Sequence, residues 1–326
     1  MPIAVLGAGA WGTALANLAA ATGEQVMLWA RDAAHVQAMA QARENARHLS
    51  GVPLTSSVEP TAEISCVADV DLVLAAVPAQ AFREVIRESV AFARTNSPWL
   101  ICAKGIERSS KQFLSDVIAE ELRDATPAIL SGPSFAADLA AGLPTAVTLA
   151  ANDETTASEI AQRLARPSFR VYRSTDIRGV EIGGAAKNVL AIACGIAQGA
   201  GLGASAGAAL IARGFAELAR FGRALHARPE TLMGLSGLGD LVLTCSSEQS
   251  RNFSYGLALG RGEAPETAAH GRLVEGVFTA SVLIELAREH GIDMPICECV
   301  ARVVGGELQI ADAIGALLQR PQKSEM

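Results

Sequence analysis

The stretch Gly7-Ala8-Gly9-Ala10-Trp11-Gly12 decides the fold of this 326-residue chain. It has the pattern G-x-G-x-x-G and joins a short apolar run, residues 3–6, to a helical pattern at residues 11–21. In such a unit Gly7 permits a tight turn, Gly9 lets the backbone approach a pyrophosphate, and Gly12 lets the helix pack closely on the sheet. The free N–H groups of the helix N-terminus then face the phosphates. We therefore expect a dinucleotide-binding loop.

The first half of the chain alternates apolar runs with helical patterns. Strands are expected at residues 3–6, 25–30, 71–77, 99–103, 127–130, 145–149 and 169–173. Helices are expected at residues 11–21, 32–47 and 80–93, and from a cap at Ser109 or Ser110 to residue 122. Continuous Val, Ile, Leu and Ala strands between helices are typical of a mostly parallel sheet that is covered on both faces.

The pattern changes after residue 178, where strand-like runs stop. Helical patterns follow at residues 178–199, 204–226, 279–290 and 296–304, with polar, glycine-containing connections at 234–240 and 270–276. The predicted class is therefore α/β. A Rossmann-like, doubly wound domain is expected over residues 1–178, and an all-helical substrate-binding domain over residues 179–326.

Composition excludes several other classes. The net charge of −7 argues against nucleic-acid binding, and no basic run is present. No basic segment precedes the first apolar run, so we expect a cytoplasmic protein without a signal peptide. The apolar residues 182–197 contain Lys187 and Asn188, which favours a core helix over a membrane span. The six cysteines form no C-x-x-C pair, so reduced thiols and no metal site are expected.

Lys187 is the most informative single residue. It is the only charged side chain between Glu181 and Arg213, in a chain with four lysines and 23 arginines. A buried lysine has a pKa that its surroundings can tune, whereas arginine is always charged, so Lys187 suggests proton chemistry. The alternative is a structural lysine whose stem lies along a helix surface.

Four further segments have compositions suited to a site. Lys104 follows a predicted strand at the sheet edge where ligands bind, and residues 131–136 form a loop after another strand. Asp240 and Thr244, four residues apart, share one helical face. Residues 250–252, Ser-Arg-Asn, group three donors suited to a phosphate. Each also has a structural interpretation, as a surface residue, a helix cap or a surface ion pair.

The end of the second strand bears on the choice of cofactor. Arg31 stands where a carboxylate would hold the ribose hydroxyl of NAD, and Asp32 comes one residue later. Arg31 could pair with the 2′-phosphate of NADP, so we expect NADP to be accepted at least as well as NAD. The alternative makes Arg31 a surface charge and Asp32 a helix N-cap.

Taken together, these motifs give the chain a family resemblance. It resembles the bacterial-type NAD(P)-dependent glycerol-3-phosphate dehydrogenases over nearly its whole length. The motifs that carry the resemblance are Gly7–Gly12, Val77-Pro78, Ala103-Lys104-Gly105, Gly132–Ala136, Lys187-Asn188, Gly239-Asp240, Ser250–Asn252 and Val274-Glu275-Gly276. The resemblance implies an oxidoreductase that interconverts sn-glycerol 3-phosphate and dihydroxyacetone phosphate with NAD(P) and supplies phospholipid synthesis.

The resemblance also implies roles for individual residues. Lys187 matches the proton donor and acceptor, with Asp240 beside it in the catalytic site. The positions that match substrate contacts are Lys104, Gly132, Ser134, Lys187, Asp240, Ser250, Arg251 and Asn252. The positions that match cofactor contacts are Gly7, Gly9, Ala10, Trp11, Gly12, Arg31, His48, Lys104, Ala136, Arg251, Leu273 and Glu275.

Two other functions remain open at this level. A related two-domain hydroxy-acid dehydrogenase would need a carboxylate-binding group in place of Ser250-Arg251-Asn252. A nucleotide sensor without activity would be favoured by loss of Lys187 or Asp240, and both are present. We expect a homodimer, and the glycine-rich residues 182–203 could pack either against a second copy or within their own domain.

Overall fold

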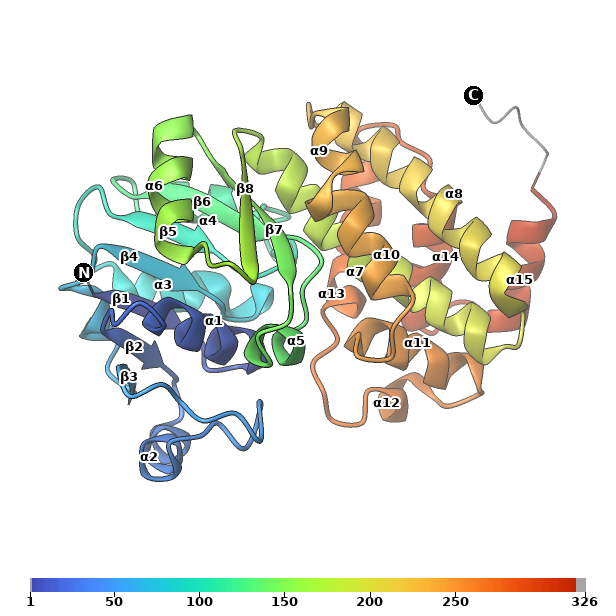
Figure 1. Ribbon diagram of the computed structural model, residues 1–326. Coiled ribbons are helices and arrows are strands. Elements are labelled where there is room, and N and C mark those ends of the chain that lie inside the picture. The colour runs from blue at the N-terminus through green and yellow to red at the C-terminus, as the bar shows by residue number, and fades with distance from the viewer. Residues whose placement is uncertain (1, 321–326) are drawn as a thin grey trace.

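Eight strands form one sheet in the N-terminal half of the computed structural model, which describes residues 2–320 (Figure 1). The strands are β1 (Ile3–Leu6), β2 (Val26–Trp29), β3 (Val58–Thr61), β4 (Leu72–Ala75), β5 (Pro98–Ile101), β6 (Thr126–Ser131), β7 (Thr145–Ala151) and β8 (Phe169–Ser174). Their order is β3-β2-β1-β4-β5-β6-β7-β8, and every neighbouring pair is parallel except β6 and β7. The first six strands of this order are those of a dinucleotide-binding sheet, so the predicted Rossmann-like fold is confirmed.

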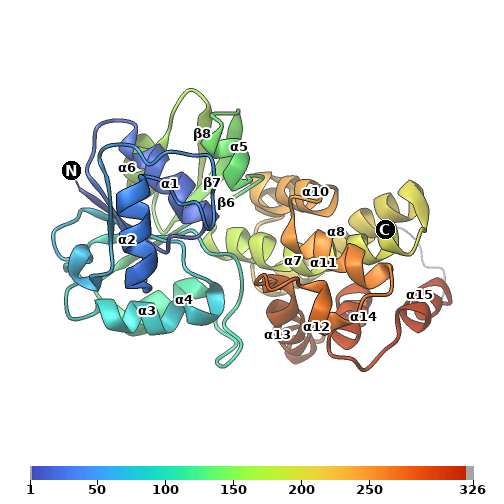
Figure 2. The same cartoon turned by 90° about the horizontal axis from the view of Figure 1, so that it is seen from below.

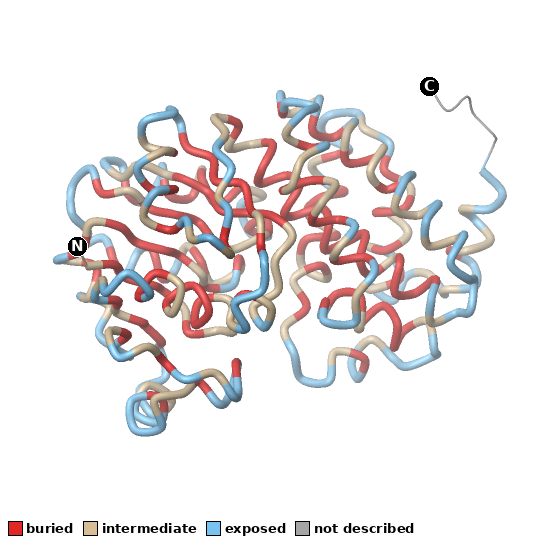
Figure 3. Tube along the Cα trace, in the orientation of Figure 1, coloured by how far each residue is buried: buried red, intermediate tan, exposed pale blue. Residues whose placement is uncertain are grey.

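Both faces of the sheet are buried, which explains why its central strands are continuously apolar. Successive side chains of a strand point to opposite faces. Ile3 and Val5 accordingly join one core with α1 (Ala10–Ala20) and α6 (Glu154–Leu164). Ala4 and Leu6 join a second core with α3 (Phe82–Ser89) and α4 (Leu114–Glu121). The two helical layers lie on opposite sides of the sheet in Figure 2, and the strands between them are buried in Figure 3.

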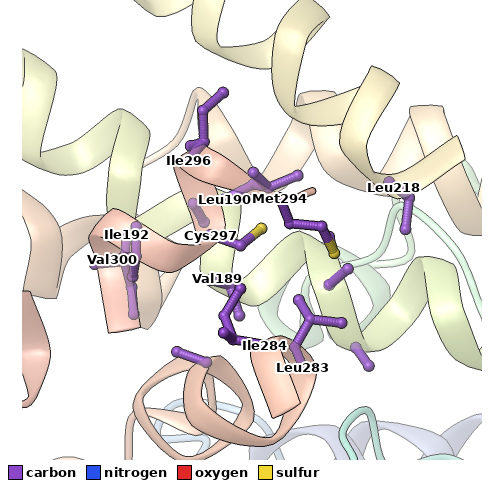
Figure 4. Packing of buried hydrophobic residues seen from close by; sticks show 14 of the residues in the cluster. Val189, Leu190, Ile192, Leu218, Leu283, Ile284, Met294, Ile296, Cys297 and Val300 are labelled. Carbon is purple, nitrogen blue, oxygen red and sulfur yellow. The ribbon is translucent and has the colours of Figure 1, made fainter. Parts of the chain in front are cut away.

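The second half of the chain is helical and is built around α7 (Ile177–Gly199) (Figure 1). The other helices are α8 (Gly203–Ala224), α9 (Pro229–Met233), α10 (Asp240–Cys245), α11 (Arg251–Gly260), α12 (Pro265–Ala268), α13 (Glu275–Glu289), α14 (Pro295–Val304) and α15 (Ile310–Leu318). Side chains of α7, α8, α13 and α14 interlock in the core of this half (Figure 4). The predicted domain boundary, between residues 178 and 179, falls inside α7.

α7 is long and apolar enough to cross a membrane, but its apolar window is 100% buried inside the protein, as in a core helix. Close helix packing explains its glycines. A Cβ on Gly195 would lie 2.1 Å from the carbonyl oxygen of Phe253, and one on Gly256 would lie 2.2 Å from that of Ile192. Gly199 and Gly260 repeat this arrangement one turn further on. The glycine-rich stretch thus packs within its own domain, against α11.

Three predicted helices are shorter than expected, and one of them is α3, which covers Phe82–Ser89 of the predicted residues 80–93. α2 (Ala33–Ala42) ends before residue 47 because Arg43 adopts a left-handed backbone, with φ of 51°. Its guanidinium donates to the carbonyl oxygens of Val58 at 2.9 Å and Thr55 at 2.6 Å, which ties the helix end to β3. α4 begins at Leu114 and not after Ser109 or Ser110. The Ser110 hydroxyl donates instead to Glu107.

Several elements have no counterpart in the sequence analysis. Residues 234–240, expected as a connection, contain a π-helical turn, η3 (Leu235–Gly239), that runs directly into α10. β3, α15 and α5 (Ala136–Ala140) are further additions, as are the short 3₁₀ turns η1 (Ile64–Val67) and η2 (Ala79–Ala81). The π-helical turn matters most for the site, because Asp240 is the first residue after it.

Candidate active site

The glycine loop between β1 and α1 has the geometry that its pattern predicts. Gly7 has φ of 111°, and a Cβ there would lie 2.8 Å from the carbonyl oxygen of Ala76. A Cβ on Gly12 would lie 1.9 Å from the carbonyl oxygen of Gly7. A Cβ on Gly9, in contrast, would meet nothing within 4 Å, and no side chain caps α1. The Trp11 indole N–H is buried without a partner among residues 2–320. This open cradle at a helix N-terminus fits a pyrophosphate.

Asn45 supports this loop, although the sequence analysis did not select it. It is fully buried, and its amide donates to the carbonyl oxygen of Ala8 at 2.9 Å and to the Thr13 hydroxyl at 2.7 Å. His48, three residues on, is exposed and packs edge-to-face on His35, with ring centroids 5.4 Å apart. Desolvation lowers the pKa of His48, and the positive charge of Arg251 on the helical domain adds to this effect. Arg251 thus lies close enough to His48 for their charges to interact.

Arg31 and Asp32 lie at the carboxyl end of β2. Asp32 is the N-cap of α2, because its carboxylate accepts the N–H groups of Ala34 at 3.0 Å and His35 at 3.2 Å. Arg31 is exposed, and its guanidinium lies 3.3 Å and 3.6 Å from carboxylates of α3, on Glu84 and Glu88. Exposed pairs of this kind contribute little, so Arg31 can exchange them for a phosphate at low cost.

The centre of the site is one carboxylate between two lysines. Asp240 is fully buried, and its two oxygens lie 2.6 Å from the Nζ of Lys187 and 2.6 Å from the Nζ of Lys104. Lys187 also donates to the Thr244 hydroxyl at 2.9 Å, and Lys104 to the carbonyl oxygen of Gly132 at 3.0 Å. Lys187 is only 7% exposed, so it is no surface lysine.

The pKa of Lys187 reflects this environment. Burial lowers it to about 8, because the charged form loses water. The charge of Asp240 opposes this shift, and the like charge of Lys104 adds to it. At neutral pH the ammonium form therefore still predominates, but it can lose its proton within an accessible pH range.

Glycines let four elements converge on this cluster. Lys104 follows β5, Gly132 follows β6, Lys187 lies in α7 and Asp240 begins α10. A Cβ on Gly183 would lie 2.4 Å from the carbonyl oxygen of Ser236, so only glycine lets the π-helical turn pack on α7 one turn before Lys187. A Cβ on Gly184 would lie 2.9 Å from the Ser131 hydroxyl oxygen and 3.4 Å from Cγ of Lys104, so glycine lets α7 pack closely on the end of β6 beside that lysine.

The three predicted phosphate donors differ in their surroundings. Ser250 is the N-cap of α11, and its hydroxyl accepts the N–H of Phe253 at 3.2 Å. The Asn252 amide donates to the side-chain oxygen of Asn188 at 2.9 Å and accepts the N–H of Gly276 at 2.8 Å. Arg251 is exposed at the helix N-terminus, where its charge and the helix dipole both favour an anion. Asn188, next to Lys187, was missed as a site residue although its motif had been recognised.

The remaining predicted residues lie in loops or at the first residue of a helix. The Ser134 hydroxyl donates to the carbonyl oxygen of Gly132 at 3.1 Å. Glu275 begins α13, accepts the N–H of Ala79 at 3.4 Å, and its other oxygen is buried without a partner in the part of the chain that the structure describes. Burial raises the pKa of Glu275. Ala10 and Ala136 are half-buried at the starts of α1 and α5, and Leu273 is half-buried just before α13.

Fold and site together define a class. The glycine loop lies on a dinucleotide-binding sheet, and a lysine–carboxylate cluster lies at the carboxyl edge of that sheet. These are the features of a two-domain NAD(P)-dependent dehydrogenase. Between residues 2 and 320 no group of three His, Cys, Asp or Glu side chains could hold a metal ion.

Comparison with known proteins narrows the class to one family. Residues 2–157 and 176–315 match the N-terminal and C-terminal models of NAD-dependent glycerol-3-phosphate dehydrogenase. The chain is 56% identical over 326 residues to glycerol-3-phosphate dehydrogenase [NAD(P)+] of Beijerinckia indica, covering 99% of this chain and 97% of that protein. The counterpart from Bradyrhizobium sp. strain BTAi1 is 58% identical over 323 residues, covering 99% and 98%.

The solved structures agree. A crystal structure of glycerol-3-phosphate dehydrogenase from Coxiella burnetii superposes with a TM-score of 0.94 at 41% identity, covering 98% of this chain and 99% of that one. The chain therefore belongs to the NAD-dependent glycerol-3-phosphate dehydrogenase family, as the motifs predicted.

Proposed function

We propose that this protein is an oxidoreductase that interconverts sn-glycerol 3-phosphate and dihydroxyacetone phosphate with NAD(P), and so supplies glycerol phosphate for phospholipid synthesis. The observation that carries the proposal is the buried Lys187–Asp240–Lys104 cluster, at the sheet edge next to the glycine loop. The family to which the chain belongs supports the choice of substrate. It also favours this reaction over that of a hydroxy-acid dehydrogenase or of a nucleotide sensor.

Lys187 is the proposed proton donor. The glycine loop, together with Trp11, Arg31, His48 and Glu275, would hold NAD(P)H, which would supply the hydride for the ketone carbon. Negative charge then grows on the ketone oxygen, and Lys187 Nζ delivers its proton there. Asp240 holds the ammonium in place through the 2.6 Å contact, and Thr244 fixes its direction. Lys104 adds a second positive charge near the developing oxyanion.

The direction of the reaction should follow the protonation state of Lys187. Reduction needs the ammonium form, which predominates below a pKa of about 8. Oxidation needs the neutral amine as a base, and its fraction rises as the pH passes that value. We therefore expect ketone reduction to be favoured near pH 7 and oxidation of glycerol phosphate to be favoured at alkaline pH. A ratio of the two kcat values that does not change with pH would contradict this assignment.

Arg251 is proposed to bind the phosphate of the substrate and to contact the cofactor. It lies at the N-terminus of α11, close enough to His48 for their charges to interact, and its guanidinium can bind a phosphate through two hydrogen bonds. Anchoring the phosphate orients the ketone for hydride transfer. Ser250 and Asn252 are proposed to contribute their remaining hydrogen-bonding capacity to the same group, and Gly132 and Ser134 are proposed to contact the substrate as well.

Three further proposals concern the cofactor, the assembly and the compartment. NADP is accepted at least as well as NAD, because Arg31 can pair with the 2′-phosphate and Asp32 is committed to capping α2. The protein acts as a homodimer in the cytoplasm. Sedimentation velocity tests the dimer, and a monomeric protein would contradict it.

The function is tested by following NADPH and NADH oxidation in parallel at one pH with dihydroxyacetone phosphate as the substrate. Rapid oxidation of both cofactors, at least as fast with NADPH, is expected. A 2-keto acid without a phosphate serves as the control substrate and should give no turnover. Turnover of the keto acid, with none of dihydroxyacetone phosphate, would favour the hydroxy-acid dehydrogenase.

A further inference from the structure

A second concave site lies on the helical domain. A cavity of about 1050 Å³ is formed by α8, α14, α15 and the C-terminal part of α7. These helices lie at the end of the molecule remote from the sheet (Figures 1 and 2). None of the proposed catalytic, substrate or cofactor residues lines it. Its volume is about that of the largest ordinary small-molecule sites.

The walls of this cavity are aliphatic. α8 contributes Ala206, Ala209 and Leu210, and α14 contributes Val300 and Val303 from the facing side. At the rim two large apolar side chains are exposed to water: Leu202 is 42% exposed and Leu318 is 80% exposed. A concave apolar surface open to water is unusual in a folded protein unless something binds there.

Positive charge gathers along the α8 side. Arg213 and Arg220 are both exposed and line the cavity. They are seven residues apart, which places them on one face of α8, about 10 Å apart along its axis. Arg220 donates to the backbone carbonyl oxygen of Asp293 at 2.9 Å, which leaves the rest of its guanidinium available. Within residues 2–320 neither arginine forms a salt bridge, and Arg220 lies near enough to the Glu217 carboxylate for their charges to interact.

The two acidic side chains of the lining are already engaged. Asp293 pairs with Arg320 at 2.6 Å. Glu217 accepts the N–H groups of Ile296 at 2.8 Å and Cys297 at 3.2 Å, at the start of α14. The cavity therefore combines an aliphatic interior with two available guanidinium groups at one side.

We propose that this cavity binds a single-chain acyl lipid with an anionic head group. The acyl chain lies along the aliphatic walls of α8 and α14, and the head group lies between Arg213 and Arg220. Both features are required, because an uncharged chain leaves the arginines unused and a compact anion leaves the apolar walls in water. A phosphate or carboxylate can accept hydrogen bonds from two guanidinium groups at once.

The probes are oleate and 1-oleoylglycerol 3-phosphate, titrated below their micelle concentrations into the full-length protein and followed by calorimetry. Saturable binding of one molecule per chain is expected for at least one of them, and the stronger probe tells whether the head group is a carboxylate or a phosphate. Free glycerol 3-phosphate, which lacks the chain, can bind only at the catalytic site. The lipid titration is therefore repeated with that site saturated by glycerol 3-phosphate.

Matched variants on α8 locate the binding site. Ala209→Trp fills the cavity and should abolish lipid binding, whereas Ala212→Trp, on an exposed residue outside the lining, should not. Arg213→Ala with Arg220→Ala should weaken binding about tenfold or more, the loss expected when about 1.4 kcal/mol of ion pairing is removed. Arg223→Ala is the control, because Arg223 is an exposed arginine of α8 outside the lining, and it should leave the affinity for the lipid unchanged.

Three results would overturn the proposal. The first is the absence of saturable binding of either lipid, and the second is binding that Ala209→Trp leaves unchanged. The third is a dimer, seen by sedimentation velocity, that Ala209→Trp dissociates and Ala212→Trp does not, because a second copy of the chain would then occupy the cavity. Each result is independent of turnover with dihydroxyacetone phosphate, so it is distinguishable from a failure of the proposed activity.

Discussion

Replacing Asp240 with asparagine should shift the pH dependence of ketone reduction. The carboxylate is fully buried and lies 2.6 Å from both lysine ammonium groups. In Asp240→Asn the opposing charge is lost, and Lys104 still repels the proton on Lys187. An opposite charge at this distance is worth about 1–3 pKa units, so the pKa of Lys187 should fall from about 8 by about two units.

The consequence at neutral pH is a loss of the acid form. At pH 7 the protonated fraction of Lys187 should fall from about nine-tenths to about one-tenth, which lowers kcat for reduction about tenfold. The alkaline limb of the kcat profile should move to lower pH by about two units. Removing one partner of a buried charge pair also destabilises a fold, by about 3–5 kcal/mol. The thermal unfolding of Asp240→Asn is therefore measured alongside its kinetics.

A second variant gives the opposite sign. Lys104→Met removes the like charge that lowers the pKa of Lys187. The alkaline limb of the kcat profile of this variant should therefore move to higher pH, even where kcat itself is reduced. The assay is NADPH oxidation with saturating dihydroxyacetone phosphate from pH 6 to pH 10. Both variants must be folded for this comparison. If the alkaline limbs of their two kcat profiles move in the same direction, or do not move, the electrostatic reasoning is refuted.

Four other substitutions test separate parts of the account. Arg251→Ala should raise KM for dihydroxyacetone phosphate at least about tenfold through loss of a charge-assisted hydrogen bond, and an unchanged KM in steady-state kinetics would remove Arg251 from the phosphate site. Arg31→Ala should raise KM for NADPH about tenfold and leave that for NADH unchanged; equal effects on both would argue against a 2′-phosphate contact. Gly195→Ala should destabilise the fold by about 1–3 kcal/mol or more in chemical denaturation, because its Cβ would lie 2.1 Å from a carbonyl oxygen. Gly207 lies in α8 with open space around it, so Gly207→Ala should instead stabilise the fold by about 0.5–1 kcal/mol. Similar changes in the free energy of unfolding for Gly195→Ala and Gly207→Ala would contradict the close packing of α7 on α11.

The fold was predictable from the sequence where buried positions require apolar residues or glycine. The central strands are continuous apolar runs because both of their faces are covered, and Gly7 and Gly12 are required by contacts of 2.8 Å and 1.9 Å. β3, with the sequence Val-Glu-Pro-Thr, lies at the sheet edge and is only partly buried, so it has no apolar run to detect. The antiparallel direction of β7 depends on how the chain returns to the sheet, and local sequence does not encode it.

The site was predictable in its composition and less so in its connections. Lys187 stood out because a charge in an apolar helix needs a partner, and Asp240 proved to be that partner. Asn45 was hidden because it lies within the helix predicted over residues 32–47, and its role depends on the early end of α2. The hydrogen bonds of Asn252 to α7 and α13 join segments far apart in the sequence, so spacing alone suggested three equivalent donors at residues 250–252.

The assignment of Lys187 as the proton donor is tested most directly by kcat of Lys187→Ala for reduction of dihydroxyacetone phosphate at pH 7. Lys111→Ala removes a half-buried lysine outside the site that pairs with Glu285 and Glu289, and it serves as the control. The account predicts a loss of about 10²–10⁴ for Lys187→Ala, the usual contribution of a general acid, with NADPH affinity and thermal unfolding preserved. A loss below about tenfold in a folded protein that still binds NADPH would contradict it.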